Sequence, residues 1–190
     1  MFEFSRKPPF DADTLSSIWV MAARDESPVL TAFSVSYRLG GTSPKEVIEL
    51  VIAYDAILAT GHISKEEILA ATEFAFGAGA KRVVITHPEL ATPKLDLPTM
   101  VQLAKAGAYM EFCAVNLLPT FYCLSLQSLI EAIEAVTPER AILSSDGGQP
   151  FNPRPPEAIR IVVQSLHEKG VPLETIRKMC IENQKLLLGL

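Results

Sequence analysis

The sequence lacks several features that would assign a function class at once. Its 190 residues include only three cysteines, with no CxxC pair, so no disulfide framework is indicated. No cluster of basic residues occurs and the formal net charge is -5, which argues against a nucleic-acid partner. Neither a GxGxxG nor a Walker A pattern is present, so a nucleotide-binding domain is not favoured. Scattered thiols are typical of a reduced, cytoplasmic protein, and that is the location we expect.

The sequence also lacks a convincing membrane segment. Its first residues have no apolar core of the kind found in secretory signals. Residues 112–130 carry no charge, but Asn116 and Pro119 interrupt this stretch near its middle. We therefore interpret it as a buried strand, a loop and the start of a helix, and we expect no membrane partner.

What the sequence does contain is enough apolar residues for one core. Hydrophobic residues make up 48% of the chain and charged residues 21%, which excludes a disordered chain. We expect a single domain over residues 1–190, with residues 1–16 as an N-terminal extension. At about 30 residues per strand–helix unit there is room for about six units, whereas a closed eight-unit barrel needs about 250 residues.

Most of the chain repeats one pattern, in which a short apolar run precedes a polar loop and an amphipathic helix. Strands are predicted at 56–60, 82–86, 108–114 and 141–145, and helices at 64–77, 98–105, 125–136, 156–168 and from about 172 to 183. Weaker signals at 18–21 and at 31–37, the latter a strand or half of a hairpin, add one irregular unit with a helix over 44–54. The alternation predicts an α/β fold of parallel βα repeats, about five units in all.

Capping residues support two of these helix starts. Ser64 and Glu67 have the spacing of a capping box at the start of helix 64–77. Ser43, Pro44 and Glu46 predict the start of helix 44–54 in the same way.

Polar residues stand at the ends of the predicted strands. His62, His87 and Asp146 each follow an apolar strand, and Glu111 lies within the third strand. Because the carboxyl ends of parallel strands share one face, where ligands bind, these side chains can converge. Imidazole nitrogen and carboxylate oxygen are ligands that zinc and similar divalent ions take. The pattern predicts a divalent metal site, for zinc above all, with Mn, Fe or Ni as alternatives.

The sequence leaves structural interpretations of these residues open. His62 can cap a helix or bond a loop carbonyl, and His87 can serve the extended turn that the following proline favours. Asp146 precedes two glycines and can serve a sharp turn. His167 lies late in a helix, where helix-end stabilisation or solvation explains it. Glu111 in a core strand would be costly without a partner, which favours a function or an ion pair.

Several segments together resemble the amidohydrolase-like metal-dependent hydrolases, and most of all an uncharacterised branch related to that superfamily. The segments are ILATGHISKEE, RVVITHPE, GAYMEF, AILSSDGGQPFNPRPPEAIR and the C-terminal ENQKLLLGL. The resemblance extends over residues 17–190 and is strongest over 58–156. In the superfamily a His after strand five and a His after strand six bind metal, and an Asp after strand eight binds metal and moves protons. By motif, these places fall on His62, His87 and Asp146.

The chain departs from the superfamily pattern in its first half. The superfamily carries a His-x-His pair on its first strand, and no such pair occurs here. The ligand after strand four is also unassigned, and Asn183 is followed by Gln184 where the superfamily commonly has proline. The expected fold is therefore a partial TIM-barrel-like one, with the last five units and without the first three.

The resemblance implies hydrolysis of a small-molecule amide, ester or related bond by a metal-activated water. Asp146 would accept the proton of that water, and Glu111 would orient a ligand histidine. Gln149, Asn152 and Arg154 are predicted substrate contacts. The missing His-x-His pair leaves an alternative open, a non-catalytic truncated barrel that binds a ligand or partner. Because an open half-barrel needs cover for its edges and inner face, we expect a homo-oligomer, most simply a dimer.

Overall fold

The computed structural model describes residues 17–24, 27–36 and 44–190. Six strands of this described part form one sheet in the order β2-β1-β3-β4-β5-β6. The strands are β1 (Ser17–Arg24), β2 (Ser27–Ser36), β3 (Ile57–Ala59), β4 (Val83–Thr86), β5 (Tyr109–Cys113) and β6 (Ala141–Ser144). Strands β3 to β6 are parallel, whereas β1 and β2 form an antiparallel hairpin that joins the sheet beside β3.

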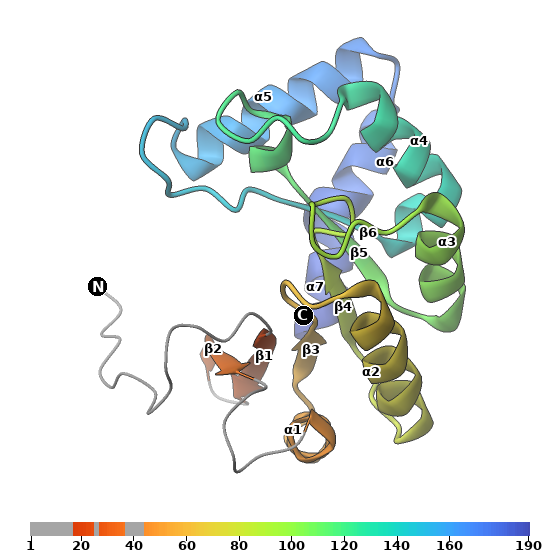
Figure 1. The fold of residues 1–190 in the computed structure, drawn as a ribbon. Coiled ribbons are helices and arrows are strands. Elements are labelled where there is room, and N and C mark those ends of the chain that lie inside the picture. Colours follow the sequence, from red (N-terminus) through yellow and green to blue (C-terminus); the bar gives the residue numbers. More distant parts are fainter. Residues whose placement is uncertain (1–16, 25–26, 37–43) are drawn as a thin grey trace.

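Helices connect the parallel strands and cover the sheet (Figure 1). They are α1 (Pro44–Ala53), α2 (Lys65–Gly77), α3 (Leu97–Ala106), α4 (Leu126–Val136), α5 (Pro155–Glu168), α6 (Leu173–Arg177) and α7 (Asn183–Leu188). A π-helical stretch, η3 (Lys178–Glu182), joins α6 to α7, and short 3-10 helices lie at η1 (Ala114–Leu117) and η2 (Pro138–Arg140). Among the described residues, no helix combines the length and apolar character needed to cross a membrane.

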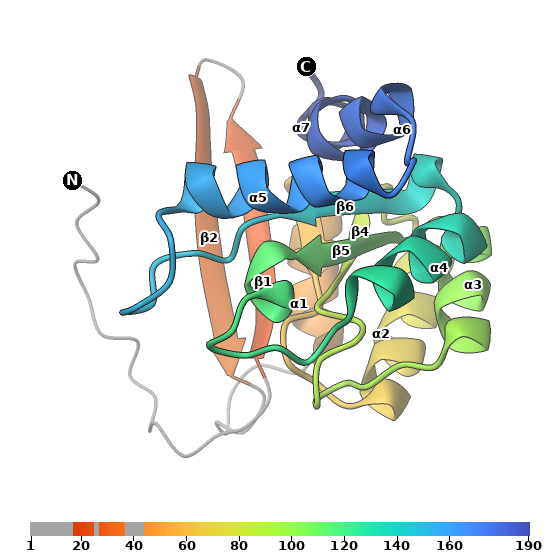
Figure 2. The ribbon, with the colours of Figure 1, turned by 90° about the horizontal axis from the view of Figure 1, so that it is seen from above.

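Alternate residues of the parallel strands face two separate hydrophobic clusters, as a strand's two-residue period requires. On one face the strands join the larger cluster with the connecting helices, through Leu58, Ile85, Phe112 and Leu143. On the other face a smaller cluster forms with α7, from Ile57, Ala59, Val84, Ile142 and Leu187. Figure 2 shows α7 across the sheet from α2 and α3. Both faces of the parallel strands are therefore covered, which explains why their sequences are apolar throughout.

Local signals in the sequence set the helix ends. Ser64 Oγ accepts from the backbone N–H of Glu67 at 3.3 Å, and Glu67 Oε2 accepts from the N–H of Ser64 at 2.8 Å. The predicted capping box of α2 is thereby confirmed. The side chains of Asp96 and Ser125 accept from the N–H groups of Thr99 and Ser128 and so cap α3 and α4, and Gly107 ends α3 at a φ of 117° that glycine adopts readily.

The free edge of β6 is covered by the C-terminal helix. Asn183 Nδ2 donates to the carbonyls of Pro138 and Ala141, both at 2.7 Å, and Gln184 Nε2 donates to the carbonyl of Leu143 at 2.9 Å. Carbonyls along an edge strand otherwise form a template for pairing with another strand. The two amides occupy this template, so β6 is protected from edge-to-edge pairing.

The α/β class with parallel βα repeats is confirmed for the part from β3 onward, where predicted and observed boundaries agree closely. Of the two interpretations of residues 31–37, half of a hairpin is confirmed, because β1 and β2 pair antiparallel. The irregular unit is therefore not a parallel βα unit, and four parallel units remain in the described residues. Only two residues separate these strands, and a parallel connection needs a dozen or more. The last helix also continues past Asn183 to Leu188. The predicted Ser43 cap and the 1–16 extension lie outside the described residues.

Candidate functional site

The turns after β3, β4 and β6 bring together the three residues predicted to bind metal. The rings of His62 and His87 are stacked, with centroids 5.1 Å apart and 22° between their planes. His87 Nε2 lies 3.4 Å from Asp146 Oδ2. His87 is buried, whereas His62 and Asp146 are exposed, so the cluster opens to solvent at one side.

The backbone turns sharply at each of these strand ends. Gly61, His87 and Asp146 have φ angles of 62°, 48° and 44°, in the left-handed region. Glycine adopts this region without cost, but histidine and aspartate carry a Cβ that makes it unfavourable. The N–H of His87 donates to the carbonyl of Glu111 at 3.2 Å, which extends the β4–β5 pairing by one residue and anchors the turn. Strain held in place by such bonds is a common property of functional residues.

Both ring nitrogens of His87 have a neighbour. Nε2 faces Asp146, and Nδ1 lies 3.2 Å from Asn116 Nδ2. The same Asn116 nitrogen donates to Glu89 Oε1 at 2.7 Å. Four side chains, from the loops after β4, β5 and β6, therefore form a continuous polar chain in the order Glu89, Asn116, His87 and Asp146.

The sequence reasoning missed two members of this polar chain. Asn116 was noted only as a residue that interrupts an apolar stretch, although a polar side chain in such a stretch requires a buried partner. Glu89 belongs to the THPE segment, but nothing in its spacing distinguishes it from a solvated loop residue. The polar side chain of Asn116 in an apolar stretch was the one signal in the sequence for this part of the site.

Burial and charge shift the two clustered histidines in opposite directions. Desolvation, assisted by the neighbouring His87, lowers the pKa of His62. Desolvation also acts to lower the pKa of His87, but the adjacent Asp146 and the charges of Glu111 and Glu89 outweigh it, and the pKa is raised. Burial raises the pKa of Glu89, whose Oε2 is buried without a hydrogen-bond partner in the described structure. The cluster thus favours a proton on His87 rather than on His62.

Glu111 and Cys113 lie two residues apart on β5 and so share one face of the sheet. Glu111 is partly buried, and its charge contributes to the raised pKa of His87. Cys113 Sγ lies 3.0 Å from Ser144 Oγ, and burial raises the pKa of this thiol well above its ordinary value. A protonated thiol is a poor metal ligand, so the donors of the cluster remain imidazole and carboxylate.

Two of the three predicted substrate contacts are engaged within the loops. Gln149 Nε2 donates to the carbonyl of Asp146 at 2.7 Å, and Gln149 Oε1 accepts from Asn152 Nδ2 at 3.1 Å. Asn152 Oδ1 in turn accepts from the Thr120 hydroxyl at 2.5 Å, which ties the loop after β6 to the loop after β5. Gln149 and Asn152 therefore shape the turn that carries Asp146. Arg154 is exposed at the start of α5.

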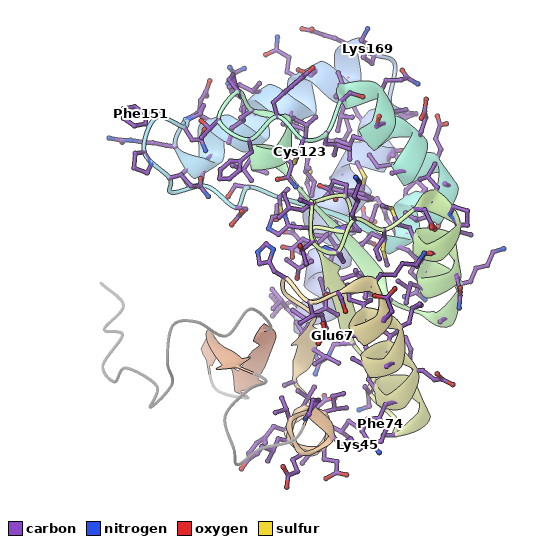
Figure 3. All side chains as sticks on the ribbon, viewed as in Figure 1. Lys45, Glu67, Phe74, Cys123, Phe151 and Lys169 are labelled. Atoms are coloured by element: carbon purple, nitrogen blue, oxygen red, sulfur yellow. The ribbon has the colours of Figure 1, made fainter. Side chains whose placement is uncertain are left out.

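Exposed aromatic side chains mark the outer parts of these two loops. Phe121 and Tyr122 follow η1, and Phe151 follows β6; their exposed fractions are 49%, 69% and 100%. Figure 3 shows Phe151 pointing away from the molecule at the tip of its loop, while Cys123 lies further in.

The donor set suits a divalent ion in part. Two ligands of a tetrahedral zinc ion, at bond lengths of about 2.0–2.1 Å, stand roughly 3.3 Å apart. The His87 Nε2–Asp146 Oδ2 distance of 3.4 Å matches this spacing and is longer than a normal charge-assisted hydrogen bond. However, no group of three His, Cys, Asp or Glu side chains in residues 17–24, 27–36 and 44–190 is arranged to hold a metal ion. His87 and Asp146 thus fit as two ligands, and His62 stacks beside them.

The chain was compared with known protein families. Residues 20–111 are similar to a family of unknown function (DUF6282). This segment is slightly under half of the chain and includes His62, His87 and Glu111, but it ends before Asn116 and Asp146. A comparison with curated proteins gives no match.

Proposed function

We propose that this chain is a metal-dependent hydrolase that acts on a small-molecule amide, ester or related bond. The observation that carries the proposal is the convergence of His62, His87 and Asp146 at the carboxyl ends of β3, β4 and β6. Ligands bind at this end of parallel strands. The proposal includes a partial TIM-barrel-like fold of the amidohydrolase type, supported by the parallel βα units and by the order of the strand-end motifs.

His62, His87 and Asp146 are the residues that would hold the ion, with zinc as the first candidate and Mn, Fe or Ni as alternatives. A bound divalent ion would lower the pKa of a water toward about 7 and polarise the bond to be cleaved. The N–H of His87 is anchored on the Glu111 carbonyl and Asn116 contacts the ring at Nδ1, so the position of the ring is fixed before any ligand arrives.

Asp146 is the proposed proton carrier. Its side chain is 47% exposed, so its carboxylate is reachable from solvent while Oδ2 faces His87. It accepts a proton from the attacking water and returns it to the leaving nitrogen or oxygen. The hydrogen bond from Gln149 to the Asp146 carbonyl holds the turn in the conformation that directs this carboxylate toward the cluster.

A second candidate is ligand binding without catalysis by the same cluster. It is favoured by the lack, within the described residues, of three donors in a ready metal-binding arrangement. The two candidates differ in whether the isolated protein retains a stoichiometric ion.

Metal analysis of protein purified without added metal tests the proposal. We expect at least about half an equivalent of Zn, Mn, Fe or Ni per chain, lost in His87→Ala. His167→Ala is the matched control, because His167 is exposed on α5, and it should retain the metal. Hydrolysis of a panel of chromogenic esters and amides should follow the metal content across the three proteins. A lower content in the wild type, with no change in His87→Ala, would overturn the catalytic proposal in favour of ligand binding.

A further inference from the structure

The orientation of the Asn116 carboxamide follows from its hydrogen bonds. Its Nδ2 lies 2.7 Å from Glu89 Oε1 and 3.2 Å from His87 Nδ1. Glu89 Oε1 acts as an acceptor when the carboxyl is ionised. The structure turns the NH2 end of Asn116 toward both neighbours, and with Glu89 ionised each of its two hydrogens has one acceptor.

The position of Asn116 is fixed from the backbone side as well. The residue is 1% exposed, and its carbonyl accepts from the N–H groups of Cys123 and Leu124 at 3.0 and 3.1 Å. These bonds close the loop after β5 around the residue. The carboxamide can change its partners only by turning about its own side-chain bonds.

This orientation determines where neutral His87 carries its proton. A ring nitrogen that accepts from an N–H cannot carry a hydrogen itself, so Nδ1 is bare and the hydrogen is on Nε2. Nε2 is the nitrogen that faces Asp146, with Oδ2 3.4 Å away. The contacts of Glu89, Asn116 and Asp146 are thus all compatible with a single tautomer.

We infer that Asn116 is a positioning residue that fixes the tautomer of His87, with the proton on Nε2 facing Asp146. The consequence of this inference for metal binding rests on the proposed function. A histidine that binds an ion through Nε2 carries its hydrogen on Nδ1 and donates it to an acceptor behind the ring. Asn116 therefore opposes binding of an ion at Nε2 until its carboxamide turns and presents Oδ1 instead.

Nitrogen NMR on metal-free protein labelled with 15N-histidine tests the inference. The spectrum is taken at about pH 9, well above the ordinary histidine pKa of about 6.5, so that the rings are neutral. The chain has only three histidines, so variants of His62 and His167 assign the His87 signals. We expect the proton on Nε2 in the wild type. A proton on Nδ1 would overturn the inference without any variant being made.

Asn116→Asp tests whether the side chain of residue 116 determines the tautomer of His87. Its carboxylate can only accept, so the His87 proton should move to Nδ1, and zinc affinity should rise by about 10- to 100-fold, as expected for a changed partner behind a ligand histidine. Asn152→Asp is the matched control, because it makes the same chemical change at a loop amide bonded to Thr120 rather than to His87. Equal His87 spectra for both variants would refute a role for Asn116. If no variant binds zinc, the proposed function fails, while the tautomer measurement still decides the inference.

Discussion

The covering of the β6 edge makes a quantitative prediction for Asn183. This residue is fully buried and its Nδ2 donates to two backbone carbonyls, while its Oδ1 is buried without a hydrogen-bond partner in the described structure. Asn183→Ala removes two hydrogen bonds of about 1 kcal/mol each. The Pro138 carbonyl keeps its bond from the N–H of Ala141, but the Ala141 carbonyl loses the amide at a further cost of about 1–3 kcal/mol. Removal of the unpartnered Oδ1 offsets part of this loss in the free energy of unfolding. We expect a net loss of about 2–4 kcal/mol in the free energy of unfolding.

Two further variants make the test specific. Asn183→Asp places a carboxylate oxygen against the two carbonyl oxygens, so it should destabilise the fold more than Asn183→Ala. Gln184→Ala removes a single hydrogen bond to Leu143 and should cost only about 1 kcal/mol. Urea unfolding followed by circular dichroism gives the free energy of unfolding of each of the three variants. The values are compared with the dependence on urea concentration held equal for all proteins. The reasoning is refuted if Asn183→Ala lies within about 0.5 kcal/mol of the wild type, or if Asn183→Asp is no worse than alanine.

Three other predictions concern the cap, the ion pair and assembly. Ser64→Ala removes the capping box of α2 and should lower the free energy of unfolding by about 1 kcal/mol in urea titrations, and an unchanged value would contradict this role. Asp146→Asn should lower the pKa of His87 in an NMR titration. Because the folded pKa is raised, the pair stabilises the protein below about pH 6.5 and this is lost as pH rises through the folded pKa. Asp146→Asn should thus cost more stability at about pH 6 than at about pH 9, and the reverse order would refute the pairing. Since β6 is covered and β2 is the other edge strand of the sheet, light scattering at micromolar concentration should give a dimer, and a monodisperse monomer would contradict the expected assembly.

The sequence predicted the part of the fold that local patterns encode. Ser64 and Glu67 specify the start of α2 through two short-range hydrogen bonds, so their spacing alone is informative. The direction of β1 and β2 is not encoded in this way, because an apolar strand looks the same in parallel and antiparallel pairing. The π-helical stretch before Asn183 was also missed, since its residues have ordinary helical character.

The candidate site was predictable where it coincides with strand ends. His62, His87 and Asp146 follow strands, and the shared direction of parallel strands places such residues on one edge. Asn116 lies in η1 instead, after an apolar strand and within a loop whose path no local pattern specifies. The engagement of Gln149 in its own loop was equally hidden, because a loop amide has the same sequence appearance whether it binds substrate or backbone.

The left-handed backbone at Asp146 has a consequence for how this position evolves. Its φ of 44° suits glycine, and the corresponding turn after β3 already has one at Gly61. Relief of the Cβ strain favours glycine by about 1 kcal/mol, so above the pKa of His87, where the ion pair adds no stability, selection for folding alone should replace Asp146. In a library screened only for folded protein, glycine should become enriched at residue 146. If natural variants keep aspartate there, the carboxylate is being retained for a task other than stability.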